Sequence, residues 1–193
     1  RYLRSLQERR EEVLRAIESQ GNLTPALRQA VEAASTLAEV EDLYRPYRPK
    51  RRTRATMARE KGLTPLAEAL WKQDGRDPAT LAQNYVNPSL GVDTIDDALA
   101  GASDILAEEI SDDAAIRKEL RQRMARRAVL ASRAANPEQD SVYRLYYDFS
   151  CPVAKLQGHQ ILALNRGEKE GFLKLSVDLP GAEGSALVCR HAL

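Results

Sequence analysis

A chain of 193 residues is long enough for one domain, or for one domain with a small appendage. Apolar residues make up 43% of the chain but aromatic residues only 5%, so its core must be built mainly from Leu, Ala, Ile and Val. Positive and negative charges nearly balance, at a net charge of +1. No apolar run approaches the ~18 residues of a membrane span, and no signal peptide opens the chain. The two cysteines lack metal-ligand spacing and do not suggest a disulfide scaffold.

The beginning of the chain predicts an antiparallel helical hairpin. Leu, Val and Ile recur at helical spacing over residues 3–20, and Gly21 follows as a stop. Thr24 and Pro25 then supply an N-cap hydroxyl and a first-turn proline. The apolar spacing continues this second helix to about Tyr44.

Two prolines, Pro46 and Pro49, bar a continuous helix and favour extended backbone after the hairpin. Four helices with local start signals are predicted beyond them, because a threonine or aspartate can cap a helix and proline is tolerated in its first turn. These helices are expected to start at Thr53, at Thr64-Pro65, at Asp77-Pro78 and at Asp93.

The helix after Asp93 has the clearest amphipathic pattern, with apolar side chains on one arc of residues 95–110 and acids opposite. A long helix is predicted from Asp112 or Asp113 to about Ala134. Residues 138–149 are rich in tyrosine and fit helical spacing better than strand alternation.

The last part of the chain is expected to hold a short helix and a β-hairpin. The helix runs from His159 to Arg166, and Gly167 is expected to end it as a left-handed cap. Residues 172–178 alternate apolar and polar side chains, which predicts a strand, and residues 186–189 are its candidate return strand.

These elements predict a mainly α fold, namely an irregular multihelical bundle with a short C-terminal β-strand or β-hairpin. Two domains are expected: residues 1–135 as a multihelical domain, and residues 136–193 as a smaller segment leading toward a further domain. The chain begins at Arg1 and stops just after a new segment has started, so we expect it to be part of a longer protein.

The strongest local feature is the basic segment, Arg45 to Lys61, in which eight cations accompany one acid, Glu60. Arginine can grip phosphate oxygens with two parallel hydrogen bonds, and an interleaved tyrosine can stack on a base. The same segment could instead be a strap whose arginines meet the acids of the helix after Asp93. The residues predicted to bind nucleic acid are Arg45, Tyr47, Arg48, Lys50, Arg51, Arg52, Arg54 and Arg59.

A second basic face is predicted on the helix after Asp113. Its charges wrap the polar side of the helix, which is typical of a solvated face, and they could attract the acidic helix that precedes them. The residues of this face are Arg117, Lys118, Arg121, Arg123, Arg126 and Arg127.

No residue pattern predicts catalysis, a cofactor or a metal site, so the chain is expected not to be an enzyme. Asp97, Asp104 and Glu108 lie along a polar helix face without a nearby histidine. His159 and His191 lack a cysteine or aspartate at catalytic spacing, and no phosphate-binding loop or nucleophile elbow occurs.

The segment from Leu43 to Thr56, LYRPYRPKRRTRAT, resembles the Tex family of transcription accessory proteins. Further matching motifs occur in order: AREKGL at residues 58–63, PLA at 65–67, ALAGASDILAEEI at 98–110 and LALNRGE at 162–168. They extend over nearly the whole chain. Gly158-His159-Gln160 departs from the Ser-His-Arg-like start expected for the penultimate helix, which weakens a binding role there.

This resemblance implies the helical N-terminal region of a multidomain, cytoplasmic bacterial protein that binds RNA and acts in transcription. An RNase H-like domain of the YqgF type, helix-hairpin-helix elements and an RNA-binding OB-fold would lie downstream. The expected partners are therefore RNA or DNA, bound weakly by this region alone, and those downstream domains. The alternative is a protein-interaction module that docks on RNA polymerase or other transcription factors, marked by an apolar patch near Trp71 or residues 143–149.

Overall fold

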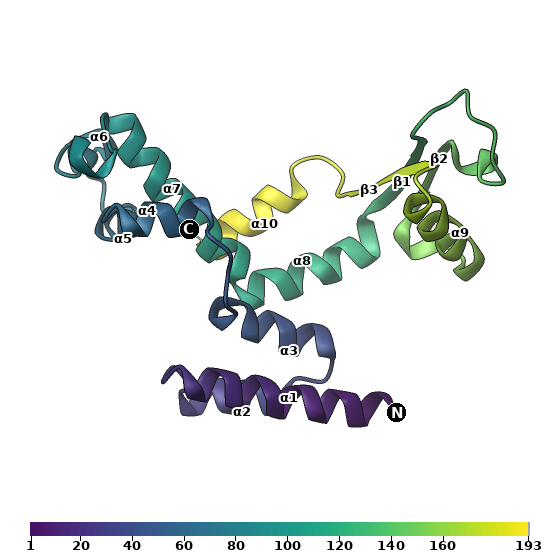
Figure 1. Ribbon diagram of the computed structural model, residues 1–193, viewed down its shortest axis with the longest axis horizontal. Helices are drawn as coiled ribbons and strands as arrows, with labels where there is room; N and C mark the ends of the chain where they lie inside the picture. The colour runs from purple at the N-terminus through teal and green to yellow at the C-terminus, as the bar shows by residue number, and fades with distance from the viewer. Residues whose placement is uncertain (193) are drawn as a thin grey trace. The chain divides into compact units, whose positions relative to one another are not determined.

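The structure is a computed structural model that describes residues 1–192 (Figure 1). The chain divides into two compact units, Arg1–Arg117 and the residues from Lys118 onward. The expected mainly α fold is confirmed. The expected boundary after residue 135 would separate the first strand, Val129–Ala134, from the two strands that pair with it in the second unit.

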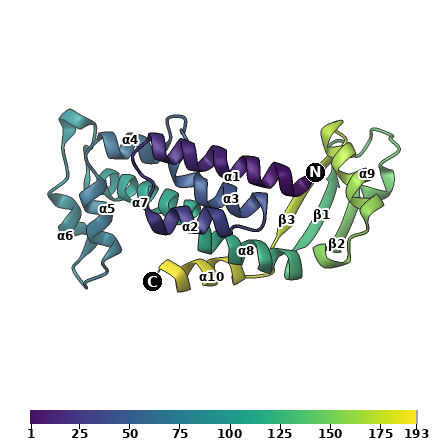
Figure 2. The ribbon, with the colours of Figure 1, turned by 90° about the horizontal axis from the view of Figure 1, so that it is seen from below.

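The first unit opens with three helices that lie side by side, as Figure 2 shows: α1 (Tyr2–Ser19), α2 (Pro25–Ala33) and α3 (Leu37–Tyr44). Thr24 caps α2 as predicted, by accepting a hydrogen bond from the Leu27 amide. The prediction of one helix from Thr24 to Tyr44 is wrong, because Ala34 takes an extended conformation and Thr36 caps a new helix. The buried side chains between the three helices are Leu6, Val13, Ile17, Val31, Ala34 and Val40.

A second core of the first unit surrounds α7 (Ile95–Asp112). The elements that precede α7 are η1 (Arg45–Tyr47), α4 (Arg54–Glu60), α5 (Thr64–Trp71), α6 (Pro78–Gln83) and η2 (Pro88–Leu90). α4, α5 and α6 all contact α7. The predicted apolar arc of α7 is confirmed, since Ala98, Ala102 and Ile105 are fully buried.

Most of the local start signals in this region are confirmed. Thr53 caps α4 and Asp77 caps α6 with side-chain oxygens. The cap of α7 is Thr94, one residue later than predicted, and it forms a capping box with Asp97. Asp113 accepts a hydrogen bond from the Ile116 amide at the start of α8 (Ala114–Arg127).

The second unit contains a three-stranded antiparallel sheet in the order β2-β1-β3. Its strands are β1 (Val129–Ala134), β2 (Asp148–Pro152) and β3 (Leu173–Asp178). The predicted helix to Ala134 is wrong, because α8 ends at Arg127 and the next residues form the central strand. Pairing on both edges satisfies the backbone of β1 and outweighs the helix propensity of its alanines.

The tyrosine-rich residues 138–149 do not form the predicted helix. They contain the short η3 (Arg144–Tyr146) and lead into β2, while η4 (Val153–Lys155) follows that strand. Tyr143 is buried, and Tyr146 and Phe149 pack beside it with their rings 5.3 Å apart.

The helix α9 (Gly158–Lys169) packs against β3, as Figure 1 shows. Gly167 is not the predicted left-handed cap, because it lies inside α9 and is buried. A β-carbon on Gly167 would lie 2.6 Å from Leu173 Cδ1, so the glycine permits a close approach of helix and sheet. The predicted strand over residues 172–178 is confirmed as β3.

The predicted return strand at residues 186–189 is wrong, because these residues belong to α10 (Glu183–Ala192). Pro180 and Gly181 form the expected turn, and Gly181 has a positive φ of 60°. The turn therefore leads from the sheet into a helix, and the partner of β3 is β1.

Candidate nucleic-acid interface

The basic segment, Arg45 to Lys61, lies along the acidic side of α7. Its second half is α4, whose Ala55 and Ala58 are buried in the core around α7. This packing fixes the backbone of the segment, so the small apolar side chains of α4 determine which cations reach the carboxylates of α7.

Two cations of the segment converge on Asp112, a buried carboxylate at the C-terminal end of α7. Arg45 Nε lies 2.8 Å from Asp112 Oδ1, and Lys50 Nζ forms an ion pair with Asp112 Oδ2. Lys50 Nζ also lies 3.2 Å from Glu108 Oε1, one helical turn earlier. Both cations are therefore largely neutralised within the fold.

Glu108 connects three groups of the basic segment. Its Oε1 accepts a hydrogen bond of 2.7 Å from Arg59 Nη1, and its Oε2 accepts one of 2.9 Å from the Thr53 hydroxyl. Burial raises the pKa of Glu108, but the hydrogen bonds from Arg59, Thr53 and Lys50 outweigh burial and hold the pKa below its ordinary value. The ionised carboxylate is thus the form that the fold stabilises.

The remaining arginines of the predicted site face solvent. Arg54 Nε lies 3.4 Å from Asp104, but its side chain is 82% exposed. Arg52 pairs at 3.0 Å with Glu60 across two exposed side chains. The side chains of Arg48 and Arg51 are exposed and make no hydrogen bond or ion pair with any residue between 1 and 192.

Tyr47, unlike these arginines, does not face solvent fully. Its ring is half-buried against the core between α1, α2 and α3, and the side-chain amide of Gln20 donates a 3.0 Å hydrogen bond to its carbonyl. Tyr44 packs on the same core, with the Arg9 guanidinium 5.5 Å from its ring centroid. Base stacking by Tyr47 stays a prediction, because the ring also serves the core.

An open hollow of about 680 Å³ lies within the first unit, between the α2 and α3 helices on one side and α7 on the other. One wall is apolar and includes Leu27 and Leu43, and the other carries acids of α7. Arg48 and Lys50 also line the hollow, so an extended anion at Arg48 would meet both cations and carboxylates.

The second predicted basic face is mostly paired. Arg117 Nε lies 2.8 Å from Asp42, a buried carboxylate of α3. Arg127 lies 2.9 Å from Glu183 of α10, and Arg123 lies 3.8 Å from the same residue. Lys118 and Arg121 also have interaction partners.

Arg126 differs from the rest of this face, because it is exposed and has no ion-pair partner among the described residues. The second basic face therefore does not form one continuous free surface. Its role in binding nucleic acid stays a prediction.

The three acids along the polar face of α7 all have structural roles. Asp104 and Glu108 pair with the basic segment, and Asp97 closes the capping box, where the Thr94 hydroxyl and amide lower the pKa of its carboxyl. Within residues 1–192, no group of three or more His, Cys, Asp and Glu side chains could hold a metal ion. None of the described helices is long and apolar enough to cross a membrane.

Sequence reasoning missed three of the carboxylates that hold the cations. Asp112 was expected only as a helix cap, Asp42 was not considered, and Glu183 was assigned no role. A signal for the first of these was present, because Glu108 and Asp112 are four residues apart and therefore share one helix face beside the basic segment. Asp42 and Glu183 pair through tertiary contacts that no local spacing reveals.

These observations define the class of protein. It is a mainly helical module with a cationic segment that its own acidic residues partly neutralise. A family model described as Tex central region-like matches residues 73–192, and the chain belongs to this family. The family description places the matched residues in a central region, where the resemblance had suggested an N-terminal one.

Relatives support the same membership. The chain is 44% identical over 180 residues to "Protein tex" of Bordetella pertussis and 38% identical over 178 residues to "Transcriptional accessory protein Tex" of Neisseria gonorrhoeae. These alignments cover 92% and 91% of the chain but only 23% of each relative. It is also 29% identical over 187 residues, 92% of the chain, to "S1 RNA-binding domain-containing protein 1" of Pongo abelii, of which it covers 18%.

Proposed function

We propose that this chain is a non-enzymatic helical scaffold region of a Tex-like, nucleic-acid-binding transcription accessory protein. In this proposal it positions the other domains of the same protein and adds a contact with the phosphate backbone. The names of relatives support the transcription and RNA-binding parts, since one is named a transcriptional accessory protein and another is named for an S1 RNA-binding domain.

The observation that carries the phosphate contact is the division of the basic segment into two sets of cations. Arg45, Lys50 and Arg59 face α7 and are paired with its carboxylates. Arg48 and Arg51 are exposed and unpaired. Unpaired guanidinium groups can bind phosphate without first breaking an internal ion pair.

Arg52 and Arg54 extend this outward set, because exposed ion pairs contribute only ~0–1 kcal/mol each and can exchange a carboxylate for a phosphate. A contact through so few arginines releases few counterions, so it is weak when the chain acts alone. It contributes more when a second nucleic-acid-binding domain of the same protein holds the ligand nearby.

RNA and DNA share the phosphate chemistry of this contact. The relative named for an S1 RNA-binding domain supports RNA as the principal ligand. A second role, docking on RNA polymerase or another transcription factor, would use a different surface, because the outward arginines alone offer no apolar anchor.

The phosphate contact is tested by measuring the affinity of the chain for a fluorescent single-stranded RNA at several salt concentrations. The Arg48→Ala/Arg51→Ala variant loses two cations that bind no carboxylate. We expect its affinity to fall and the slope of log K against log salt to decrease in magnitude by about 1.4, because each phosphate contact on a single strand contributes about 0.7.

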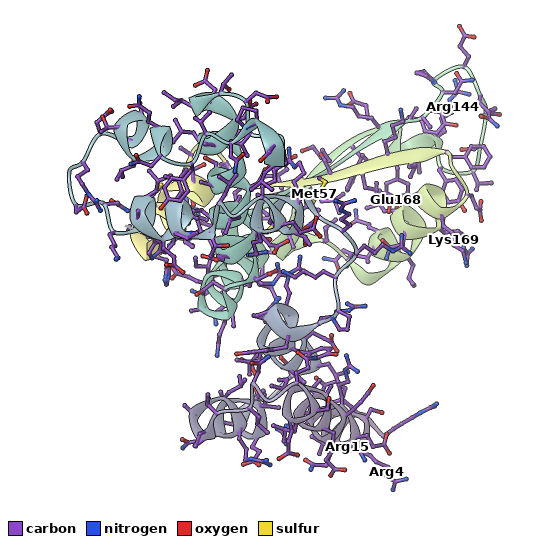
Figure 3. The ribbon with its side chains drawn as sticks, turned by 60° about the vertical axis from the view of Figure 1, so that its left-hand side comes forward. Arg4, Arg15, Met57, Arg144, Glu168 and Lys169 are labelled. Carbon is purple, nitrogen blue, oxygen red and sulfur yellow. The ribbon has the colours of Figure 1, made fainter. Side chains whose placement is uncertain are left out.

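The matched control is Arg4→Ala/Arg15→Ala, which removes the same charge from α1. Figure 3 shows both side chains projecting from α1, and both are exposed without an ion-pair partner among residues 1–192. This control should bind RNA with the original slope. Equal losses in the two variants would leave only a general effect of net charge and would refute the proposed contact.

A further inference from the structure

The helix α9 carries a solvent-facing stripe that the fold does not use. Its inner side is fixed by Leu164 and Gly167, which are buried in the core of the second unit. On the opposite side, residues at positions i, i+3, i+4 and i+7 line up along the helix. We call these four residues the α9 stripe: Leu162, Asn165, Arg166 and Lys169.

All four residues of the α9 stripe are exposed, and they line one open hollow. Leu162 is 72% exposed in the middle of the helix. The side chains of Arg166 and Lys169 make no hydrogen bond or ion pair with a described residue. The stripe is thus an apolar centre followed by two unpaired cations.

The stripe and its hollow carry more positive than negative charge. Glu170 also lines the hollow and keeps its negative charge, while its carboxylate accepts a 2.9 Å hydrogen bond from the hydroxyl of the buried Tyr143. Arg166 and Lys169 are two cations beside this one carboxylate. Glu168 is exposed, but Figure 3 shows it leaving α9 on a different side from Lys169. A partner that lies along the stripe therefore meets net positive charge.

We propose that the α9 stripe binds an amphipathic helix with an acidic face from a protein partner. The spacing of Leu162, Asn165, Arg166 and Lys169 is that of one helix face that packs on another helix. Leu162 fits between apolar side chains of the partner, while Arg166 and Lys169 pair with carboxylates at the edge of the contact.

A nucleic acid fits this stripe less well, although its phosphates would satisfy the cations. The sugar-phosphate backbone offers no apolar surface to cover a leucine at the centre of the contact, and burial of apolar area is the main favourable term in most protein association. This surface differs from the basic segment, so the inference does not depend on the proposed phosphate contact.

The test uses the complete protein that contains this chain, in living cells, with the photo-crosslinking residue p-benzoylphenylalanine in place of Leu162. A second protein carries it in place of Val177, an exposed apolar residue of β3. We expect crosslinks at the first position to a peptide identified by mass spectrometry. Its sequence should be rich in acidic residues and should repeat apolar residues at helical spacing. The second position should give none to that peptide.

The charge dependence of the crosslink is measured with Arg166→Glu/Lys169→Glu, which should lower its yield about tenfold or more because like charges then face each other. Arg166→Gln/Lys169→Gln should lower it less, and Glu168→Gln should leave it unchanged. Thermal unfolding should be unaffected in all three, since these side chains are exposed. The proposal would be overturned by a crosslink to nucleic acid or by the absence of any crosslink. It would also be overturned if Arg166→Glu/Lys169→Glu left the crosslink yield unchanged.

Discussion

At the level of single residues, Asp112 anchors the start of the basic segment, because this one buried carboxylate holds both Arg45 and Lys50. Asp104 lies on the same helix and also meets the basic segment, but its partner Arg54 is almost fully exposed. A comparison of the two aspartates therefore distinguishes the effect of a buried ion pair from that of an exposed ion pair on the same helix.

We expect Asp112→Asn to lower the free energy of unfolding by about 1–3 kcal/mol, because two partly exposed cations lose their buried partner. Asp104→Asn should change it by less than about 0.5 kcal/mol. Urea unfolding of both variants measures the difference. Equal effects would show that the basic segment is not anchored at Asp112.

Glu108 makes the stability of the first unit depend on pH. Its folded pKa lies below the ordinary value of 4.5, so its contribution to stability is complete above that value and is lost as the pH falls through the folded pKa. We expect Glu108→Gln to be less stable than the original chain near neutral pH and to lose less stability on acidification. Unfolding curves collected at a series of acidic pH values measure this convergence, and parallel curves for the two proteins would contradict it.

At the level of elements, the contact between α9 and β3 depends on the absence of a side chain at Gly167. Alanine is the better helix former by about 1 kcal/mol, which alone would stabilise α9. Its β-carbon, however, would lie 2.6 Å from Leu173 Cδ1 and 3.1 Å from Tyr143 Cγ, in a buried core.

We expect Gly167→Ala to destabilise the second unit by about 1–3 kcal/mol, since overpacking outweighs helix propensity. Gly158→Ala, in the first turn of the same helix, is the control, because no atom lies within 4 Å of its added β-carbon. Thermal unfolding should therefore rank Gly167→Ala below the original chain and leave Gly158→Ala unchanged or slightly more stable. The reverse order would mean that the helix does not approach the sheet this closely.

Helix starts were predictable wherever the signal is local. Thr24, Thr53 and Asp77 cap their helices with their own side chains, so three or four neighbouring residues contain the whole interaction. The errors fall where distant segments decide the structure. Residues 128–134 look helical by composition, yet β1 is a strand because β2 and β3 pair with its two edges.

At the level of the whole molecule, the sequence predicted the basic segment and the acidic helix, and left open whether they meet. Five of the eight predicted nucleic-acid-binding residues contact carboxylates, and these are Arg45, Lys50, Arg52, Arg54 and Arg59. On the second basic face, Arg117, Arg123 and Arg127 do so as well. Sequence alone could not sort them, because which cations are neutralised depends on how α4 packs against α7.

The central claim is that Arg45, Lys50 and Arg59 hold the fold while Arg48 and Arg51 are free for phosphate. The claim is tested most directly by the salt slope for RNA binding of Arg45→Gln/Asp112→Asn. This variant removes the ion pairs of Asp112 with Arg45 and with Lys50 without changing the net charge. Its retained fold is checked by circular dichroism. The account predicts the slope of the original chain, and a decrease as large as that of Arg48→Ala/Arg51→Ala would contradict it.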